Sequence, residues 1–239
     1  MTTTLIQNLR RVNDQIAEAV QRAGRSAGSV KLIAVSKTHP AETVQLAISA
    51  GQLAFGENRV QDAVNKQAAL AALQADTSSV EWHLIGHLQS NKARLVPQAF
   101  QWVHTVDSLE VAKRVSEAAS KQGATCQALI QVNVARDVAK HGIASVGLEP
   151  LVEAILESEL EGLVLRGLMT IGKLDATEPE VHDAFATLRL LRDRIRERLA
   201  LPEFNELSMG MSSDFPLAIA EGATMVRVGS AIFGDRGNR

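Results

Sequence analysis

The chain has 239 residues, of which 46% are hydrophobic and 22% are charged, a composition typical of an ordinary globular protein. Disorder and low-complexity architectures are therefore excluded as descriptions of the whole chain. Lys and Arg number 25 and Asp and Glu number 27, for a net charge of −2, so no basic footprint for a polyanion is present and nucleic acid is not an expected partner.

The first predicted element is an amphipathic helix, because apolar residues recur at helical spacing from Leu5 to Val20 and Gly24 follows as a stop signal. Charged residues interrupt this segment, and no apolar run in the chain approaches the ~20 residues that span a bilayer. The single cysteine, Cys126, stands in an apolar string and is predicted to be a buried small residue in a reducing compartment. We therefore expect a cytoplasmic protein that does not bind membranes.

After this helix, short apolar runs alternate with helical patterns to the C-terminus, the rhythm of βα units on a parallel sheet. The predicted strands are 31–35, 53–55, 81–85, 102–106, 128–134, 164–169, 206–209 and 225–228, and the predicted helices include 41–50, 109–122, 150–157, 179–199 and 215–221. About eight βα units predict a single (β/α)8 TIM barrel over residues 1–239, with residues 1–28 as an extra N-terminal helix. An open doubly wound sheet is the alternative, because the run 53–55 is short and weakly patterned.

Lys37 is the strongest single candidate for a reactive residue, because it lies two residues after the end of the first predicted strand. Active sites of such barrels lie at the C-terminal ends of the strands. Among apolar walls, desolvation favours the neutral amine, which is a nucleophile towards an aldehyde. The alternative is an ordinary surface lysine in a βα loop.

Small residues follow the last two predicted strands, where barrels of this kind commonly bind phosphate through backbone amides. These residues are Ser208, Gly229 and Ser230, and ordinary turn chemistry is the alternative. Arg227 precedes Gly229 by two residues in the last strand, so its side chain is predicted to enter the barrel lumen, where it needs a carboxylate or a ligand as partner. An amine, an anion cradle and an inward guanidinium together describe a site for a phosphorylated aldehyde, and pyridoxal 5′-phosphate (PLP) is the candidate cofactor.

Seven motifs resemble those of the pyridoxal phosphate homeostasis protein family: AVSK, FGEN, EWHLIGHLQSNK, QVNV followed by KHG, GLMTIG, LSMGMSSDF and VRVGSAIFG. They occur in order and with matching spacing from about residue 30 to residue 236. The resemblance implies a single barrel related to the N-terminal domain of alanine racemase, with PLP held as a Schiff base on Lys37. The chain departs from the family pattern at His39, at Ser230 and in the loop 135–139, so the resemblance assigns no role to that loop.

The resemblance also implies roles for the other candidate residues. Asn58 would lie near the cofactor, Arg227 would face the pyridine nitrogen, and Ser208, Gly229 and Ser230 would bind the phosphate. An arginine does not give up its proton, so the ring nitrogen would stay unprotonated and PLP would be a weaker electron sink.

Racemisation needs a base on the face of the cofactor opposite Lys37. Alanine racemases use a Tyr from a second domain, and we expect neither here, because the chain contains no Tyr. The leading hypothesis is a monomeric PLP carrier without a clear catalytic activity, which buffers the cofactor and delivers it to apo PLP-dependent enzymes. The alternatives are a small PLP-dependent amino-acid racemase with His83 or Cys126 as its base, and a structural barrel in which Lys37 is inert.

Two histidines and a lysine are further candidates for a functional role. His83 and His87 have the spacing of two metal ligands on a helix, but their segment is predicted as strand and turn, so no metal is expected. His83 is predicted either to face the lumen near the cofactor or to be a hydrogen-bonded core histidine. Lys140 is either a second amine that transiently accepts the aldehyde or an exposed loop lysine.

Overall fold

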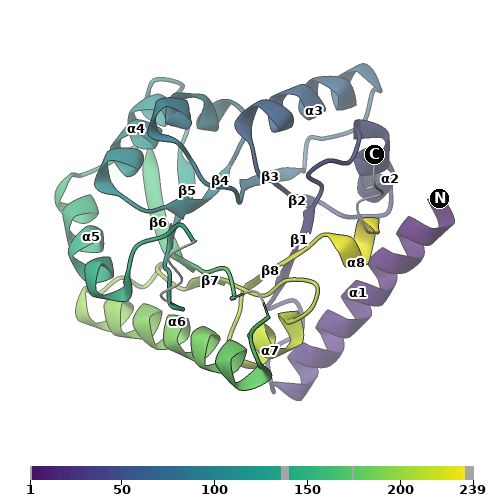
Figure 1. Cartoon of the computed structure of the whole chain (residues 1–239). Helices are drawn as coiled ribbons and strands as arrows, with labels where there is room; N and C mark the ends of the chain where they lie inside the picture. Colours follow the sequence, from purple (N-terminus) through teal and green to yellow (C-terminus); the bar gives the residue numbers. More distant parts are fainter. Residues whose placement is uncertain (1, 136–139, 174, 235–239) are drawn as a thin grey trace.

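The fold is a closed barrel of parallel strands surrounded by helices (Figure 1), and the computed structural model describes residues 2–135, 140–173 and 175–234. Each strand pairs with its neighbours in sequence, and β8 returns to pair with β1. The predicted (β/α)8 barrel is confirmed. The open-sheet alternative is wrong, because β8 pairs with β1 to close the sheet, and the short second strand is not an edge strand but pairs with both β1 and β3.

The strands occupy the predicted places with small shifts at their ends. They are β1 (Lys31–Val35), β2 (Ala54–Glu57), β3 (Glu81–Leu84), β4 (Trp102–Val106), β5 (Cys126–Gln131), β6 (Leu163–Met169), β7 (Glu206–Ser208) and β8 (Met225–Val228). The largest difference is in β5, which was predicted over 128–134. Its apolar pattern continues to Val134, but Val132 forms an isolated bridge with Ile143 beyond the strand's end.

The helices are α1 (Thr2–Arg22), α2 (Ala41–Ser49), α3 (Val60–Ala72), the 3-10 helix η1 (Ser90–Gln98), α4 (Leu109–Ser120), α5 (Ser145–Glu157), α6 (Glu178–Arg198), α7 (Phe215–Ala220) and α8 (Ser230–Phe233). Helix α1 lies outside the repeat and packs along α7 and α8 (Figure 1). The helix predicted over 150–157 begins earlier, at Ser145, so that Pro150 lies inside α5. The helix tolerates this proline because its missing N–H leaves only the carbonyl of Val146 without a helical donor, and Val146 is exposed to solvent. In the part of the chain that the structure describes, no helix is long and apolar enough to cross a membrane.

Two apolar clusters hold the fold together. The larger one fills the space between the strands and the surrounding helices. The smaller one lies within the barrel and consists of Ile33, Ala54, Trp102, Leu129, Met169 and Met225, with Ile171 packed against it. Because side chains alternate along a strand, inward residues further along the same strands continue the lumen towards the C-terminal rim.

The pairing of β1 with β8 places the first and the last strand of the barrel side by side. Ile33 is the partner of Arg227, and Ala34 is the partner of Val228. The residues that follow these strands, Lys37 on one side and Gly229 on the other, therefore lie on the same rim.

Candidate functional site

Four of the six predicted site residues lie at the C-terminal rim of the barrel. Lys37 follows β1 and is half-buried, and Asn58 follows β2 and is also half-buried. Gly229 follows β8 directly, and the exposed Ser230 is the first residue of α8. The N–H groups in the first turn of a helix have no acceptor within that helix, so the start of α8 presents donors at this rim.

A buried ion pair fixes the backbone just before Lys37. The Lys66 ammonium, from α3, binds the Glu57 carboxylate of β2, and the two side chains are 8% and 0% exposed. Lys66 Nζ also donates to the carbonyl of Ser36 at 2.7 Å, and the Ser36 hydroxyl donates to Glu57 at 2.7 Å. The carbonyl and the hydroxyl of the residue that precedes Lys37 are therefore both held by this ion pair.

Arg227 enters the lumen, as the strand alternation predicts, and is 5% exposed. Its guanidinium donates to Ser208 Oγ at 2.6 Å and to the carbonyl of Thr170 at 2.8 Å. Burial lowers the pKa of Arg227 to about 10, an effect that the Asp214 carboxylate opposes. The side chain is therefore still a cation at neutral pH.

Ser208 lies in the lumen beneath the rim. Its hydroxyl is fully buried and contacts Arg227 on one side and His104 Nδ1, at 2.9 Å, on the other. The structure thus brings Ser208 together with Arg227, whereas Gly229 and Ser230 lie beyond the end of β8.

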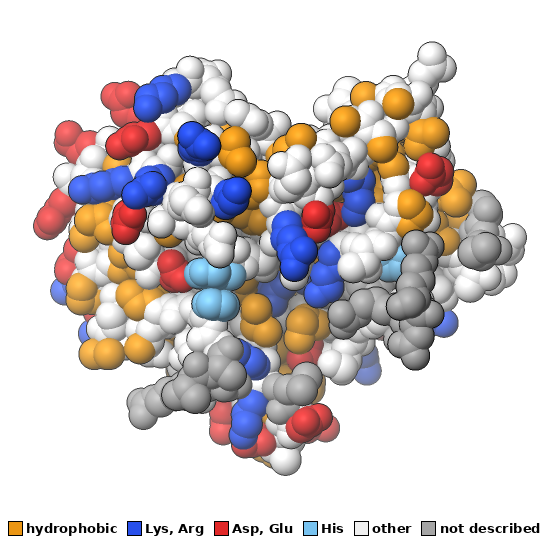
Figure 2. Space-filling model, turned by 45° about the horizontal axis from the view of Figure 1, so that its top comes forward, with side chains coloured by type: hydrophobic (Ala, Val, Ile, Leu, Met, Phe, Trp, Pro, Cys, Tyr) orange, Lys and Arg blue, Asp and Glu red, His pale blue; other side chains and the backbone are white. Residues whose placement is uncertain are grey.

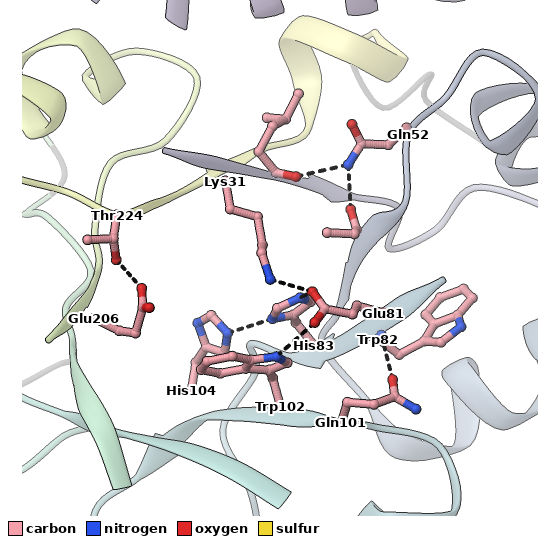
Figure 3. Close-up of polar contacts among 12 residues, drawn as sticks. Lys31, Gln52, Glu81, Trp82, His83, Gln101, Trp102, His104, Glu206 and Thr224 are labelled. Atoms are coloured by element: carbon pink, nitrogen blue, oxygen red, sulfur yellow. Dashed lines mark hydrogen bonds and ion pairs between the residues drawn. The ribbon is translucent and has the colours of Figure 1, made fainter. Parts of the chain in front are cut away.

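His104 is a lumenal residue that the sequence analysis did not single out. It is fully buried, and its Nε2 lies 3.0 Å from Nδ1 of His83, which is also fully buried (Figure 3 shows this pair). Burial is the largest cause that lowers the pKa of both histidines. The alternation of β4 carries the missed signal, because His104 shares the face of Trp102, a member of the lumenal cluster. His83 is a hydrogen-bonded core histidine that faces the lumen, as one of the two alternatives predicts.

Two other candidates have local partners. Lys140 is partly buried, and its ammonium donates to the carbonyl of Gly172. Cys126 is buried in the outer apolar cluster, its Sγ lies 3.7 Å from the Phe100 carbonyl, and burial raises the pKa of its thiol to about 11. Among the described residues, no group of three or more His, Cys, Asp and Glu side chains could hold a metal ion. Of the loop 135–139, residues 136–139 lie outside the described residues.

A surface cleft opens beside Asn58, at the ends of β2 and β3. Its volume is about 460 Å³, and its lining includes Asn58, Arg59, Gly86, His87 and Lys92. In Figure 2, Lys and Arg side chains gather in the middle of the visible face, near two histidine side chains. The rim thus combines cationic groups with a hollow.

Comparison with known proteins gives a consistent result. The family model of the alanine racemase N-terminal domain matches residues 8–237. A pyridoxal phosphate homeostasis protein of Pseudomonas aeruginosa is 46% identical over 235 residues, covering 98% of this chain and 96% of its own. The Escherichia coli K12 protein of the same name is 42% identical over 233 residues, covering 97% of each chain.

Solved structures agree with this result. PipY of Synechococcus elongatus, solved with PLP bound, has 41% identity and a TM-score of 0.79, covering 92% of this chain and 100% of its own. An alanine racemase of Clostridium difficile has a TM-score of 0.74 at 17% identity, covers 99% of this chain and 58% of its own, and shares the fold.

Proposed function

We propose, because the chain belongs to the pyridoxal phosphate homeostasis protein family, that it holds PLP reversibly on Lys37 and buffers or delivers the cofactor without catalytic turnover. The observation that carries the proposal is the placement of Arg227 beneath the rim lysine. Its hydrogen bonds to Ser208 and Thr170 go to uncharged acceptors. A guanidinium carries five N–H groups, so it can donate a further hydrogen bond to an electron-rich atom of a ligand.

The residues present fit PLP. The cofactor supplies an aldehyde that condenses reversibly with an amine, and Lys37 provides the amine at the rim. Gly229, Ser230 and the first N–H groups of α8 would hold the phosphate, and Asn58 would contact the cofactor from β2. A Cβ at Gly229 would lie 3.3 Å from the Val35 carbonyl, so a glycine keeps this edge of the site open. We assign the Ser208 side chain to Arg227, at the ring end of the site, rather than to the phosphate.

The surroundings of the two alternative bases favour a carrier over a racemase. The His83 ring nitrogens face His104 at 3.0 Å and Glu81 at 3.5 Å, so neither lone pair is directed to the rim. The Cys126 thiol has a raised pKa of about 11 and belongs to the outer cluster rather than the lumen. Arg227 is protonated and cannot act as a base at neutral pH. The chain would act as a single-domain monomer in the cytoplasm. Apo PLP-dependent enzymes would receive the cofactor from it.

Borohydride reduction of protein incubated with PLP, followed by peptide mapping, tests the cofactor site. We expect one adduct, on Lys37, and its loss in Lys37→Ala. Lys140→Ala is the matched variant, because its lysine follows β5 and donates to the Gly172 carbonyl. A PLP adduct on Lys140 in the wild type would support its role as a second amine that accepts the aldehyde. Scattered labelling of surface lysines would refute the proposed PLP site.

Two assays separate a carrier from a catalyst. Holo-protein mixed with an apo PLP enzyme should restore that enzyme's activity faster than the release of free PLP allows. Recovery at the rate set by free PLP would refute delivery. Deuterium exchange at the α-carbon of added amino acids should be negligible, and fast saturable exchange abolished by Lys37→Ala would establish the racemase instead.

A further inference from the structure

A continuous row of polar side chains crosses the barrel lumen from Arg227 to the opposite end. Arg227 Nη1 contacts Ser208 Oγ at 2.6 Å, Ser208 contacts His104 Nδ1 at 2.9 Å, and His104 Nε2 contacts His83 Nδ1 at 3.0 Å. His83 Nε2, a buried atom with no hydrogen-bond partner among the described residues, then faces the Glu81 Oε2 atom at 3.5 Å, an ion-pair distance that is longer than an ordinary hydrogen bond. Figure 3 shows the end of this row, with the His104 and His83 rings joined to each other and the His83 ring next to the Glu81 carboxylate.

Glu81 connects the row to solvent at the N-terminal end of the barrel. It is the first residue of β3, and its side chain is 39% exposed. It lines a cleft of about 450 Å³ together with Trp102, Gln127, Arg166 and Glu206. The site proposed for PLP lies at the other end, so the row joins the two ends of the lumen.

The two ends of the row determine the direction of every hydrogen bond between them. An arginine can only donate, and a carboxylate can only accept. Ser208 therefore accepts from Arg227 and is free to donate to His104 Nδ1. His104 then carries its hydrogen on Nε2 and donates to His83, which in turn presents its own Nε2–H to Glu81.

The opposite arrangement is unfavourable at the Glu81 end. It would leave a lone pair of His83 Nε2 facing a carboxylate that already accepts from Lys31 at 2.5 Å and from Trp102 Nε1 at 3.4 Å. The neighbouring His83 ring is the largest cause that lowers the pKa of Glu81 to about 2, so this group is a carboxylate throughout the neutral range. Both histidines are fully buried and their pKa values are lowered, which keeps them neutral and suits one hydrogen per ring.

We propose that Ser208, His104 and His83 form a one-directional hydrogen-bond relay through which Glu81 orients Arg227 for the PLP ring. This inference rests on the proposed function, since it assigns His104, His83 and Glu81 as positioning residues of the same site. The relay commits the Ser208 hydrogen to His104, so that its lone pairs face the guanidinium. Without a carboxylate at the far end, both directions become possible, and in the reversed one the Ser208 oxygen must accept from His104 as well as from Arg227.

The substitution Glu81→Gln tests the relay, because an amide can donate as well as accept. The matched control is Glu206→Gln, in β7 at the same end of the lumen, whose carboxylate accepts from Thr224 rather than from the relay (Figure 3). Each variant removes one negative charge. Simple charge repulsion would therefore make both bind the anionic cofactor equally or slightly more tightly.

The first measurement is the tautomer of both histidines by long-range ¹H–¹⁵N NMR in cofactor-free protein. We expect the hydrogen on Nε2 of both rings in the wild type and in Glu206→Gln, and a second tautomer at both rings in Glu81→Gln. The second measurement is the Kd for PLP, which should weaken between about twofold and thirtyfold in Glu81→Gln alone.

Each outcome decides one question. Hydrogens on Nδ1 in the wild type would overturn the relay, as would a Glu81→Gln variant with unchanged tautomers or an unchanged Kd. If the wild type does not bind PLP at all, the proposed function fails, whereas the NMR measurement on cofactor-free protein still tests the direction of the relay.

Discussion

Replacing Lys66 by methionine should destabilise the protein strongly, because it leaves a buried carboxylate without its cation. Glu57 is 0% exposed, and in the described part of the structure its Oε2 atom has no hydrogen-bond partner even with Lys66 present. Breaking a buried pair from one side costs about 3–5 kcal/mol in free energy of unfolding. For a domain of this size each kcal/mol lowers Tm by roughly 2–4 °C, so Lys66→Met should lower Tm by roughly 6–20 °C.

Thermal unfolding followed by circular dichroism measures this effect. The control is Lys173→Met, which removes a lysine from an ion pair with Glu180 whose side chains are 53% and 51% exposed, and which should cost at most ~1 kcal/mol. The double variant Lys66→Met/Glu57→Gln should recover part of the loss, because it also removes the buried charge. Equal Tm shifts for Lys66→Met and Lys173→Met would refute the reasoning.

Three further predictions follow from burial and backbone geometry. Gly210→Ala should lower the free energy of unfolding in urea by at least ~1 kcal/mol more than Gly24→Ala does. Both glycines have a positive φ, but a Cβ at Gly210 would lie 2.6 Å from an α7 side chain, whereas a Cβ at Gly24 would meet open space. Equal losses for the two variants would contradict this. The lowered pKa values of His83 and His104 mean that below about pH 6.5 the unfolded chain binds more protons than the folded one. The free energy of unfolding should therefore not depend on these histidines well above pH 6.5. At lower pH it should decrease by up to ~1.4 kcal/mol per pH unit for each histidine. Tm measured between pH 7 and pH 5 checks this, with a variant that has glutamine at both positions as the control. Cys126 should resist a thiol reagent in the folded protein and react once it is unfolded in urea, because it is buried and its pKa is raised to about 11; rapid labelling of folded protein would contradict its placement.

The barrel could be predicted from the sequence because its signal repeats along the whole chain. The elements that were missed lack that signal. In α3, Lys66 occupies an inward position between Ala63 and Leu70, so the apolar stripe is interrupted where the buried ion pair lies. The 3-10 helix η1 contains Pro97 and does not follow the 3.6-residue period on which the reading relied.

The rim positions were accessible to sequence reasoning because each lies within three residues of the end of a predicted strand. Lys37 and Gly229 needed only the knowledge of where strands end, whereas the role of Asn58 came from the family resemblance. The partners beneath them depend on which strands lie opposite one another in the lumen. His104 and Ser208, for example, meet across 104 positions of sequence, and no local pattern marks that contact.

The extra N-terminal helix belongs to the architecture of the site, although it lies outside the βα repeat. Helix α8 has four residues, far fewer than a helix needs to be stable alone, and its last carbonyls need donors from elsewhere. Asn8 of α1 donates to the Ile232 carbonyl at 3.0 Å, and Arg11 donates to the Ala231 carbonyl at 3.2 Å. These bonds join α1 to the short helix whose first residue is Ser230. The position of the proposed phosphate site is therefore fixed by contacts between the two ends of the described chain.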